Sequence, residues 1–406
     1  MRILFVHQNF PGQFVHLAPA MERRGHKVLG LGDKANEKPA QPVRTFYYKS
    51  PQAGRLNGIG ATFADVSARG EMVAGAASQL RDRHLYTPDL IVGHNGWGEL
   101  MFLRQVWPEA KILDYAEFCY RATGLDSDFD PEFQATSLTT RIATTARASH
   151  ILHQMVDADA GLAPTRWQAA SFPPEIERKI TVIHDGIDTD QVRPDALARF
   201  GIPGTDLILK AGDEVLTFVN RNLEPYRGYH ILMRALPDLL AARPEAQVVI
   251  VGADGQSYGR APEKGTWREV FLSEVKDRID PARVHFTGRI ERRQFVSLMQ
   301  VSRVHAYLTY PFVLSWSMIE AMAAGALVVG SRTGPVTEVI RDGENGRLVD
   351  FFDVPGWSVA LADALANPDR DAPLRAAARA TVLKDFDLRR VCLPRQIALL
   401  EGMGQG

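Results

Sequence analysis

Cysteines, a surplus of one charge sign and long hydrophobic runs are all scarce in this 406-residue chain. The two cysteines, Cys119 and Cys392, lie far apart and form no C-x-x-C pair, which excludes a disulfide framework and a thiolate zinc site. The 47 basic residues nearly balance the 48 acidic ones. Non-specific binding to nucleic acid depends on an excess of positive charge, so we expect no nucleic-acid partner.

Hydrophobic runs are too short to mark a membrane span or a secretory leader. The longest apolar stretch, residues 321–330, is about half the length that a spanning helix needs. The apolar residues 1–6 are followed at once by His7, Gln8 and Asn9, which ends the run early. We therefore expect a cytoplasmic protein, and the sequence leaves open a peripheral position at the inner membrane face.

Predicted strands and helices alternate along the chain, which is typical of a parallel sheet covered by helices. The alternation pauses after residues 184–188, where prolines and glycines follow, and then starts again. This predicts an α/β protein with two Rossmann-like domains, residues 1–185 and 186–385. Predicted strands are residues 3–6, 27–31, 90–93, 111–115, 150–153 and 180–183 in the first domain, and 216–220, 247–251, 284–286, 304–308 and 327–329 in the second.

A helix is predicted over residues 133–147, just before the predicted strand 150–153. In a pair of facing Rossmann-like domains, a ligand binds at the carboxyl ends of the strands, in the cleft between the domains. Such folds support many reactions, so this architecture by itself names no chemistry.

One informative segment, residues 218–228, follows a predicted strand and carries Arg221 and Arg227. Two guanidinium groups on one loop can hold a diphosphate, because each group pairs with phosphate oxygens in a forked geometry. Two arginines in solvent would show the same spacing, and the spacing alone does not decide between these readings.

A second segment, residues 310–325, runs from the end of a predicted strand into a helix. Free backbone amides at Trp316, Ser317 and Met318 would favour an anion at the helix N-terminus. Glu320 could accept hydrogen bonds from the hydroxyls of a ribose. Alternatively, Ser317 and Glu320 fit the S-x-x-E pattern of a capping box, which has a purely structural role.

These two segments, together with residues 163–168, 184–188, 284–290 and 342–349, resemble family 4 of the retaining glycosyltransferases. The resemblance extends over almost the whole chain. It implies the GT-B fold, in which two Rossmann-like domains face each other across a cleft. The N-terminal domain would bind the acceptor, the C-terminal domain would bind a nucleotide-sugar donor, and the C-terminal helix, about residues 386–406, would pack back on the N-terminal domain.

The resemblance also implies roles for individual residues. Arg221 and Arg227 would bind the diphosphate, with an arginine at position 227 where the family usually has lysine. The backbone at residues 315–317 would meet the phosphates, the segment after the strand 284–286 would hold the base, and a turn near the N-terminus would replace the family's glycine-rich loop. The implied donor-binding residues are Gly12, Arg289, Ile290, Ser315, Trp316, Ser317 and Glu320.

Phe312 departs from the family pattern E-x7-E, because it stands where the first glutamate is expected, eight residues before Glu320. In the family this glutamate contacts the transferred sugar. The donor sugar is therefore held differently, or the donor carries an unusual sugar, or transfer activity has been lost.

His94 and Glu117 are the candidate acceptor-side residues, because each follows a predicted strand and would lie at its carboxyl end. The family often has a histidine near position 117, so Glu117 is a substitution. A catalytic role and a structural role remain open for both residues.

The resulting prediction is a metal-independent, retaining hexosyltransferase that acts in polysaccharide or glycoconjugate biosynthesis. Its donor would be a UDP- or GDP-sugar and its acceptor a saccharide or glycolipid hydroxyl, with no separate cofactor. The histidines show neither H-x-H nor H-E-x-x-H spacing, so no metal site is predicted. A sugar-nucleotide epimerase of GT-B-like fold and a non-catalytic nucleotide-sugar-binding subunit are the alternatives, and the oligomeric state is left open.

Overall fold

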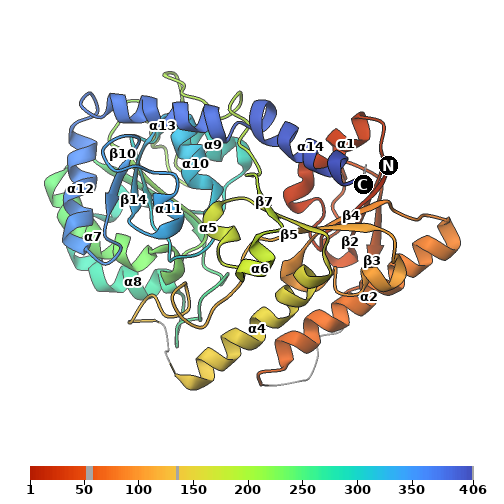
Figure 1. Cartoon of the computed structure of the whole chain (residues 1–406). Coiled ribbons are helices and arrows are strands. Elements are labelled where there is room, and N and C mark those ends of the chain that lie inside the picture. The colour runs from red at the N-terminus through yellow and green to blue at the C-terminus, as the bar shows by residue number, and fades with distance from the viewer. Residues whose placement is uncertain (52–57, 134–136, 405–406) are drawn as a thin grey trace. The chain divides into compact units, whose positions relative to one another are not determined.

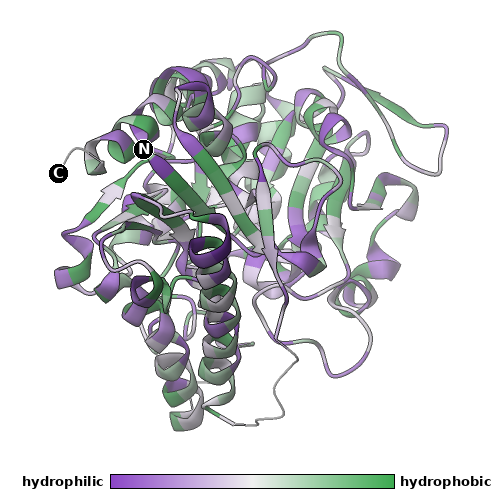
Figure 2. Cartoon of the chain, turned by 90° about the vertical axis from the view of Figure 1, so that its right-hand side faces the viewer, coloured by the Kyte–Doolittle hydropathy of each residue, from purple (hydrophilic) through white to green (hydrophobic). Residues whose placement is uncertain are grey.

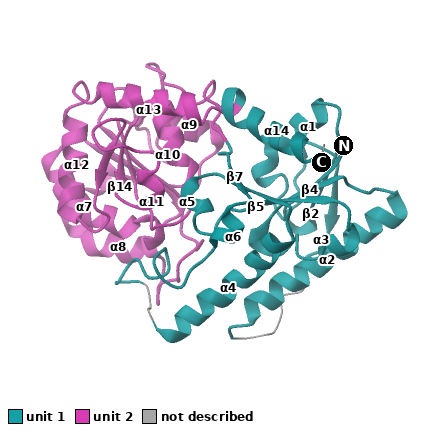
Figure 3. Cartoon of the chain, in the orientation of Figure 1, with its two compact units in different colours: residues 1–185, 389–406 teal, residues 186–388 magenta. Residues whose placement is uncertain are grey.

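The computed structural model describes residues 1–51, 58–133 and 137–404. The chain divides into two compact units, with residues 1–185 and 389–406 in unit 1 and residues 186–388 in unit 2 (Figure 3). Each unit contains one large parallel sheet with helices against it (Figure 1). The division at residues 185 and 186 coincides with the predicted domain boundary, and the last residues of the chain belong to unit 1.

Unit 1 has a seven-stranded sheet in the order β3-β2-β1-β4-β5-β6-β7, with every neighbouring pair parallel. The inner strand β1 reads Ile-Leu-Phe-Val over residues 3–6, and all four side chains are buried. Such unbroken apolar strands are expected where helices cover both faces of a sheet. The strands are β1 (Arg2–Val6), β2 (Lys27–Asp33), β3 (Thr45–Tyr48), β4 (Leu90–His94), β5 (Lys111–Tyr115), β6 (Ala160–Ala163) and β7 (Ile180–Val182).

Hydrophilic and hydrophobic residues alternate along the helices that face the viewer in Figure 2. The last helix lies against the first, and Arg24 pairs with Glu401 at 2.7 Å. The helices are α1 (Leu17–Arg23), α2 (Ala61–His84), α3 (Leu103–Val106), α4 (Leu138–Asp157), α5 (Arg166–Ala169), α6 (Pro174–Glu177) and α14 (Leu393–Met403).

The predicted strand at residues 150–153 is wrong, because these residues lie inside α4. Ala148, Ile151 and Met155 are buried in one core cluster, and their spacing is that of a helix face. The strand of this region is β6, whose small side chains gave little strand signal. Residues 134–136 of the predicted helix lie outside the described residues.

Unit 2 repeats the arrangement with a six-stranded parallel sheet in the order β12-β11-β10-β13-β14-β15. The stretch after residue 188, where the predicted alternation pauses, contains an antiparallel pair, β8 (Arg199–Gly201) and β9 (Ile208–Lys210). The sheet strands are β10 (Val215–Asn222), β11 (Gln247–Ala253), β12 (Val284–Gly288), β13 (Val304–Tyr307), β14 (Leu327–Ser331) and β15 (Arg347–Val349). The helices are α7 (Tyr229–Ala242), α8 (Trp267–Val275), α9 (Arg292–Val301), α10 (Trp316–Ala324), α11 (Gly334–Thr337), α12 (Val354–Ala366) and α13 (Ala372–Asp385).

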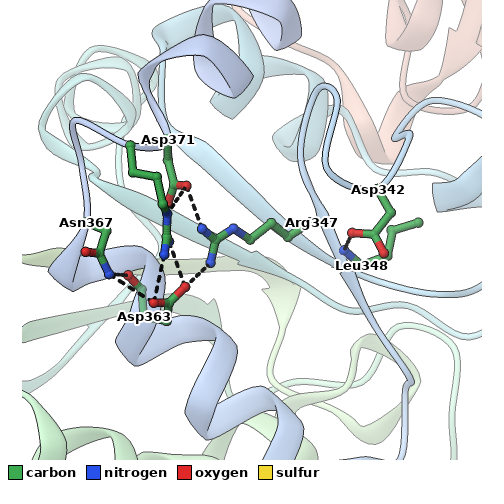
Figure 4. A network of polar contacts seen from close by, with 7 residues as sticks. Asp342, Arg347, Leu348, Asp363, Asn367 and Asp371 are labelled. Carbon is green, nitrogen blue, oxygen red and sulfur yellow. Dashed lines mark hydrogen bonds and ion pairs between the residues drawn. The ribbon is translucent and has the colours of Figure 1, made fainter.

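An ion-pair network ties β15 to α12 and α13 (Figure 4). Arg347 pairs with Asp363 on α12 at 2.6 Å and with Asp371, just before α13, at 2.5 Å. Arg370 pairs with the same two carboxylates. The hydrogen bond from Arg370, followed by those from Arg347, lowers the pKa of Asp363 to about 2. The start of α13 is therefore fixed by charge-assisted contacts.

In each sheet the order in which successive strands are added reverses beside the first strand. In unit 1, β1 lies between β2 and β4, and in unit 2, β10 lies between β11 and β13. In open α/β sheets, ligands bind outside the carboxyl ends of the strands at this point. The candidate ligand positions are thus the loops after β1 and β4 in unit 1, and the loops after β10 and β13 in unit 2. Across residues 1–51, 58–133 and 137–404, no helix combines the length and the apolar character needed to cross a membrane.

Candidate active site

The two segments singled out in the sequence follow β10 and β13, and the structure brings them into contact. Arg227 donates hydrogen bonds from Nη1 to Thr309 Oγ1 and to the Val313 carbonyl, both at 2.8 Å. The Tyr310 amide donates to the Tyr226 carbonyl at 3.1 Å. The switch point of unit 2 is therefore built from both segments together.

Gly228 makes this close contact possible. Its φ is +68°, and a Cβ atom at this position would lie 2.3 Å from Leu308 Cβ. Only glycine combines a left-handed backbone with the absence of a side chain. The glycine that follows Arg227 is thus required by the approach of the two loops.

The two arginines of the first segment have different surroundings. Arg221 is exposed, and its side chain makes no hydrogen bond or ion pair with another described residue, whereas Arg227 is only 6% exposed. Burial acts to lower the pKa of Arg227, but Tyr307, Tyr258 and Glu224 outweigh it and raise the pKa. Arg227 is therefore a fixed buried cation, while Arg221 is a cation held in solvent at the end of β10.

The N-terminus of α10 is capped by Ser315, whose hydroxyl accepts from the Ser317 amide at 3.3 Å. The Ser315 amide itself donates to the Tyr307 hydroxyl at 2.7 Å. The resemblance implied that the amides of Ser315, Trp316 and Ser317 meet the phosphates. In the structure the amides of Ser315 and Ser317 have these partners within unit 2, and the implied contact of residues 315–317 with the phosphates stays a prediction.

Glu320 is not part of a capping box. Since Ser315 is the N-cap residue, Glu320 lies in the second turn of α10, and its Oε1 accepts a hydrogen bond from Arg292 on α9. Glu320 is 5% exposed, and burial raises the pKa of its carboxyl although Arg292 opposes the rise. The interpretation as a structural cap is therefore wrong, and a role at the ligand remains open.

Phe312 is buried within an aromatic cluster. Its ring centre lies 4.8 Å from that of Tyr258 and 5.3 Å from that of Tyr226 in an edge-to-face arrangement. The Arg227 guanidinium carbon lies 5.6 Å from the Phe312 ring centre and 5.3 Å from that of Tyr258. The position where the family carries a sugar-binding carboxylate is thus occupied by aromatic and cation–π packing.

Glu224 has a positioning role that the sequence did not reveal. Its Oε2 accepts hydrogen bonds from the amides of Tyr258 at 3.2 Å and Gly259 at 3.1 Å, and Glu224 is 1% exposed. It thereby fixes the loop that carries Tyr258 to Arg227. The sequence signal for this role was a carboxylate between Leu223 and Pro225. A carboxylate that is buried needs hydrogen-bond donors, which here are backbone amides.

Arg289 and Ile290 follow β12, at the edge of the sheet and two strands from β10. Arg289 is exposed, and Ile290 packs against the core of unit 2. Both residues follow the carboxyl end of β12, as the expected role requires.

In unit 1, the structure brings His94 and Glu117 together, with 3.6 Å between His94 Nε2 and Glu117 Oε2. His94 Nδ1 accepts from the Gly96 amide at 2.9 Å, which places the proton of the neutral ring on Nε2. The ring stacks on Trp97 and Tyr115, with centres 4.4 and 5.3 Å away. His94 therefore presents Nε2 toward the carboxylate.

His7, at the end of β1, is a further member of this cluster that the sequence did not single out. Its ring centre lies 5.7 Å from that of His94, and its Nδ1 accepts from the Asn9 amide at 2.9 Å. Burial, with a smaller effect of His94, lowers the pKa of His7 to about 3. A Cβ atom on Gly12, whose φ is +50°, would lie 2.5 Å from His7 Nε2, so Gly12 allows the turn to close over this ring.

Buried polar atoms beside this cluster lack partners among the described residues. They include both side-chain polar atoms of Asn95 and Oε2 of Glu99. The other Glu99 oxygen accepts from the Tyr48 hydroxyl at 2.8 Å, and burial raises the pKa of Glu99 to about 7. Unsatisfied buried groups are costly, so polar atoms at the end of β4 are suited to a ligand rich in hydroxyl groups.

Two family models match this chain in consecutive parts. Residues 24–192 match the glycosyl transferase family 4 group, and residues 206–381 match the glycosyl transferases group 1. The first match covers most of unit 1 and ends a few residues beyond the boundary at residues 185 and 186, and the second match lies wholly within unit 2.

Curated relatives match over about half of their length. The chain is 30% identical over 237 residues to D-inositol 3-phosphate glycosyltransferase of Streptomyces scabiei, covering 55% of this chain and 50% of the relative. It is 27% identical over 248 residues to GDP-mannose-dependent alpha-(1-6)-phosphatidylinositol monomannoside mannosyltransferase of Mycolicibacterium smegmatis, covering 57% and 60%.

Solved structures of similar fold cover the chain almost completely. Sucrose-phosphate synthase of Thermosynechococcus elongatus has a TM-score of 0.75 at 19% identity and covers 100% of both chains. Anabaena Alr3699/HepE in complex with UDP-glucose has a TM-score of 0.66 at 18% identity and covers 99% of both chains. At these identities the likeness shows the fold, and it confirms the predicted GT-B class with two Rossmann-like domains.

Proposed function

Because the chain belongs to family 4 of the glycosyltransferases, we propose that it transfers a hexose from a UDP- or GDP-sugar to a hydroxyl group of a saccharide or glycolipid acceptor. The anomeric configuration would be retained, and no metal ion would be needed. Polysaccharide or glycoconjugate assembly in the cytoplasm is the setting that this activity suggests, with peripheral membrane contact left to experiment.

The observation that carries this proposal is the contact between Arg227 and the loop after β13, at the switch point of the unit 2 sheet. It places a buried cation and the N-terminus of α10 on the same side of the sheet, with Arg221 at the neighbouring strand end. Fixed positive charge at this position favours a diphosphate, since nothing needs to reorganise as negative charge develops on the leaving group.

In the proposed reaction, the bond between the anomeric carbon and the diphosphate oxygen breaks, and a bond from that carbon to the acceptor oxygen forms. The acceptor proton passes to the departing diphosphate, so charge and atoms balance without a catalytic carboxylate pair. Arg221 and Arg227 stabilise the charge that accumulates on the diphosphate. Glu320 accepts from ribose hydroxyls, and Arg292 orients its carboxylate.

On the acceptor side, we assign His94 and Glu117 to the orientation of the hydroxyl group that reacts. The neutral His94 ring can donate from Nε2, and Glu117 can accept, at positions 3.6 Å apart. Such a pair can hold one hydroxyl group that both donates and accepts. The stacked rings of Trp97 and Tyr115 fix the orientation of His94.

Phe312 leaves the donor sugar without the carboxylate typical of the family. We propose that the sugar is held differently rather than that transfer is lost, because the cations and helix N-terminus expected at the diphosphate are present. The names of the relatives, which include a GDP-mannose-dependent mannosyltransferase and D-inositol 3-phosphate glycosyltransferases, support a hexose donor and a polyol acceptor.

A melting-shift screen with UDP, GDP, ADP and dTDP would first identify the nucleotide. The matching nucleotide sugars would then be incubated with D-inositol 3-phosphate, a phosphatidylinositol mannoside or simple saccharides, and the product linkage would be read by NMR. A glycoside of retained configuration, formed equally well with a chelator present, is the expected result. Donor epimerised without acceptor, or donor bound without turnover, would contradict transferase activity, and a strict requirement for a divalent cation would contradict metal independence.

A further inference from the structure

Unit 2 contains a groove at the amino ends of its sheet strands, whereas the candidate active site lies at their carboxyl ends. Its volume is about 740 Å³, and its lining includes Gly212, Arg303 and Gly325. These residues come before β10, β13 and β14, whereas the candidate active site lies after the first two of these strands. The groove is therefore separate from the nucleotide-sugar position, and its properties do not depend on the proposed function.

Three arginines from two parts of unit 2 line this groove. Arg375 and Arg379 project from α13, where residues four positions apart lie on the same face of a helix, and Arg303 comes from the turn between α9 and β13. Like charges so placed repel one another. The pKa of Arg303 is lowered by burial first, with Arg243 and Arg375 adding to the effect, and the pKa of Arg379 is lowered by burial and by Arg193.

The acidic groups near the groove do not compensate this charge fully. Glu214 lies 3.7 Å from Arg303 Nη1, but its carboxylate is already bound by Arg243, with a hydrogen bond of 3.0 Å from Nε. Asp195, in the lining, accepts from the Leu197 amide at 2.9 Å. Asp369 is the other lining acid, and Asp213, next to the lining residue Gly212, acts to raise the pKa of Arg303. The lining itself holds three arginines and two aspartates, which is a surplus of one positive charge.

Two of the three arginines also have structural partners, so their role differs from that of the third. Arg379 donates to the Ala323 carbonyl at the end of α10, and Arg303 donates to the Leu365 carbonyl at the end of α12 at 2.7 Å. These contacts satisfy helix C-termini and hold both guanidinium groups in place. The Arg375 amide donates to the Asp371 carbonyl at 3.1 Å, but its guanidinium group makes no hydrogen bond or ion pair with another described residue, so its charge is available to a ligand.

Ion pairs hold the helix that carries two of these charges. The network of Arg347, Asp363, Arg370 and Asp371 fixes the start of α13, one turn before Arg375 (Figure 4). Alanine and proline side chains form much of the remaining lining, together with Leu383, which is 40% exposed. Fixed cations beside an open apolar wall suit a small anion that carries an organic group.

We propose that this groove binds a small phosphate ester, as a second ligand site of the chain. A phosphate group carries close to two negative charges and accepts several hydrogen bonds, which matches three guanidinium groups better than a single carboxylate does. The apolar wall leaves room for the organic part of the ester. Binding would relieve the repulsion between Arg375 and its neighbours and would stabilise the folded unit.

The test is isothermal titration calorimetry of the full chain with glucose 6-phosphate, with glucose as the uncharged probe. Arg375→Gln removes the charge that has no structural partner. Lys384→Gln is the matched control, because it removes the same charge from an exposed position of α13 outside the groove. Arg221→Ala separates this groove from the diphosphate position. Melting temperatures of all four proteins are expected to agree without ligand.

We expect glucose 6-phosphate to bind the wild type. Arg375→Gln should weaken this binding about tenfold or more, because one charge-assisted hydrogen bond is lost. Lys384→Gln and Arg221→Ala should leave the affinity unchanged. Glucose should not bind. Absence of binding to the wild type at millimolar concentration would overturn the proposal. Equal weakening by Arg375→Gln and Lys384→Gln would reduce it to a general charge effect, and loss of binding only in Arg221→Ala would place the phosphate at the other site.

Discussion

Arg227 donates a hydrogen bond to Thr309 Oγ1 at 2.8 Å, and this contact joins two loops that are 82 positions apart in the sequence. The same nitrogen also reaches the Val313 carbonyl. Arg227 is thus a structural residue as well as a candidate ligand of the diphosphate. Arg221, six positions earlier, has no such structural task, and the two arginines should respond differently to substitution.

Arg221→Ala is expected to weaken the binding of the nucleoside diphosphate by ~1.5–3 kcal/mol, the range for a hydrogen bond to a charged group. Because Arg221 is exposed and has no partner among the described residues, the melting temperature should stay within about a degree or two of the wild type. Calorimetry and thermal unfolding measure the two effects. Arg199→Ala, at an exposed position of β8, is the control, and unchanged affinity in Arg221→Ala would remove this residue from the diphosphate site.

Arg227→Lys should lower the free energy of unfolding by about 1–3 kcal/mol, although it keeps the charge. An ammonium group cannot reproduce the geometry by which one guanidinium nitrogen reaches both Thr309 and Val313. Denaturant unfolding measures this cost, and Arg221→Lys serves as the matched control with no expected loss. If both lysine variants were equally stable, the joining role of Arg227 would be refuted.

The sequence predicted the arrangement better than the contacts within it. Both segments proposed to bind the phosphates could be identified because each is continuous in the chain and follows an apolar strand. The burial of Arg227 was not predictable, since it depends on Thr309 and Val313, which reach it only after the sheet has formed. The same holds for the partners of His94, because no local pattern relates it to Glu117.

Local ambiguity explains the other errors. Ser315 and Ser317 are both good N-cap residues, and the structure uses Ser315, so the capping-box interpretation of Glu320 failed. Residues 150–153 are apolar enough for a strand, but the longer helical spacing that includes Met155 prevails. In both cases packing against distant elements selected one of two locally acceptable structures.

Glu320→Gln should reduce nucleotide affinity while leaving the melting temperature nearly unchanged. The carboxylate is buried with a raised pKa, so its removal costs little folding free energy, and Ser315 still caps the helix. Arg292→Gln should reduce affinity in the same direction, because Arg292 orients the carboxylate. Affinity by calorimetry and thermal unfolding decide the matter. A large fall in melting temperature with normal affinity would show that Glu320 is structural.

Phe312→Ala should destabilise unit 2 by about 3–5 kcal/mol, the usual cost of removing a buried aromatic ring. It should also raise KM for the donor sugar, because Tyr258 and Arg227 both pack on this ring. Phe312→Leu, which keeps most of the volume, is the companion variant and should retain most of the stability. The aromatic cluster around Phe312 would have no part in donor recognition under two conditions. The folded Phe312→Leu variant would have a normal KM for the donor, and Phe312→Ala would bind the donor as the wild type does.

Glu99→Gln should alter the dependence of stability on pH. Burial raises the pKa of Glu99 to about 7 in the folded chain, whereas it is near 4.5 when exposed. Between these values the unfolded chain has released the proton and the folded chain still holds it, so the contribution of Glu99 to stability is full below about pH 4.5 and is lost as the pH rises toward 7. Glutamine stays neutral and can still accept from Tyr48. The difference in free energy of unfolding between the variant and the wild type should therefore shift in favour of the variant by about 2–3 kcal/mol between pH 4.5 and pH 8. Tyr48→Phe is the comparison, because it removes the hydrogen bond and leaves the carboxyl group in place. Urea unfolding at the two pH values measures the difference, and parallel pH profiles for wild type and Glu99→Gln would contradict a protonated Glu99 in the fold.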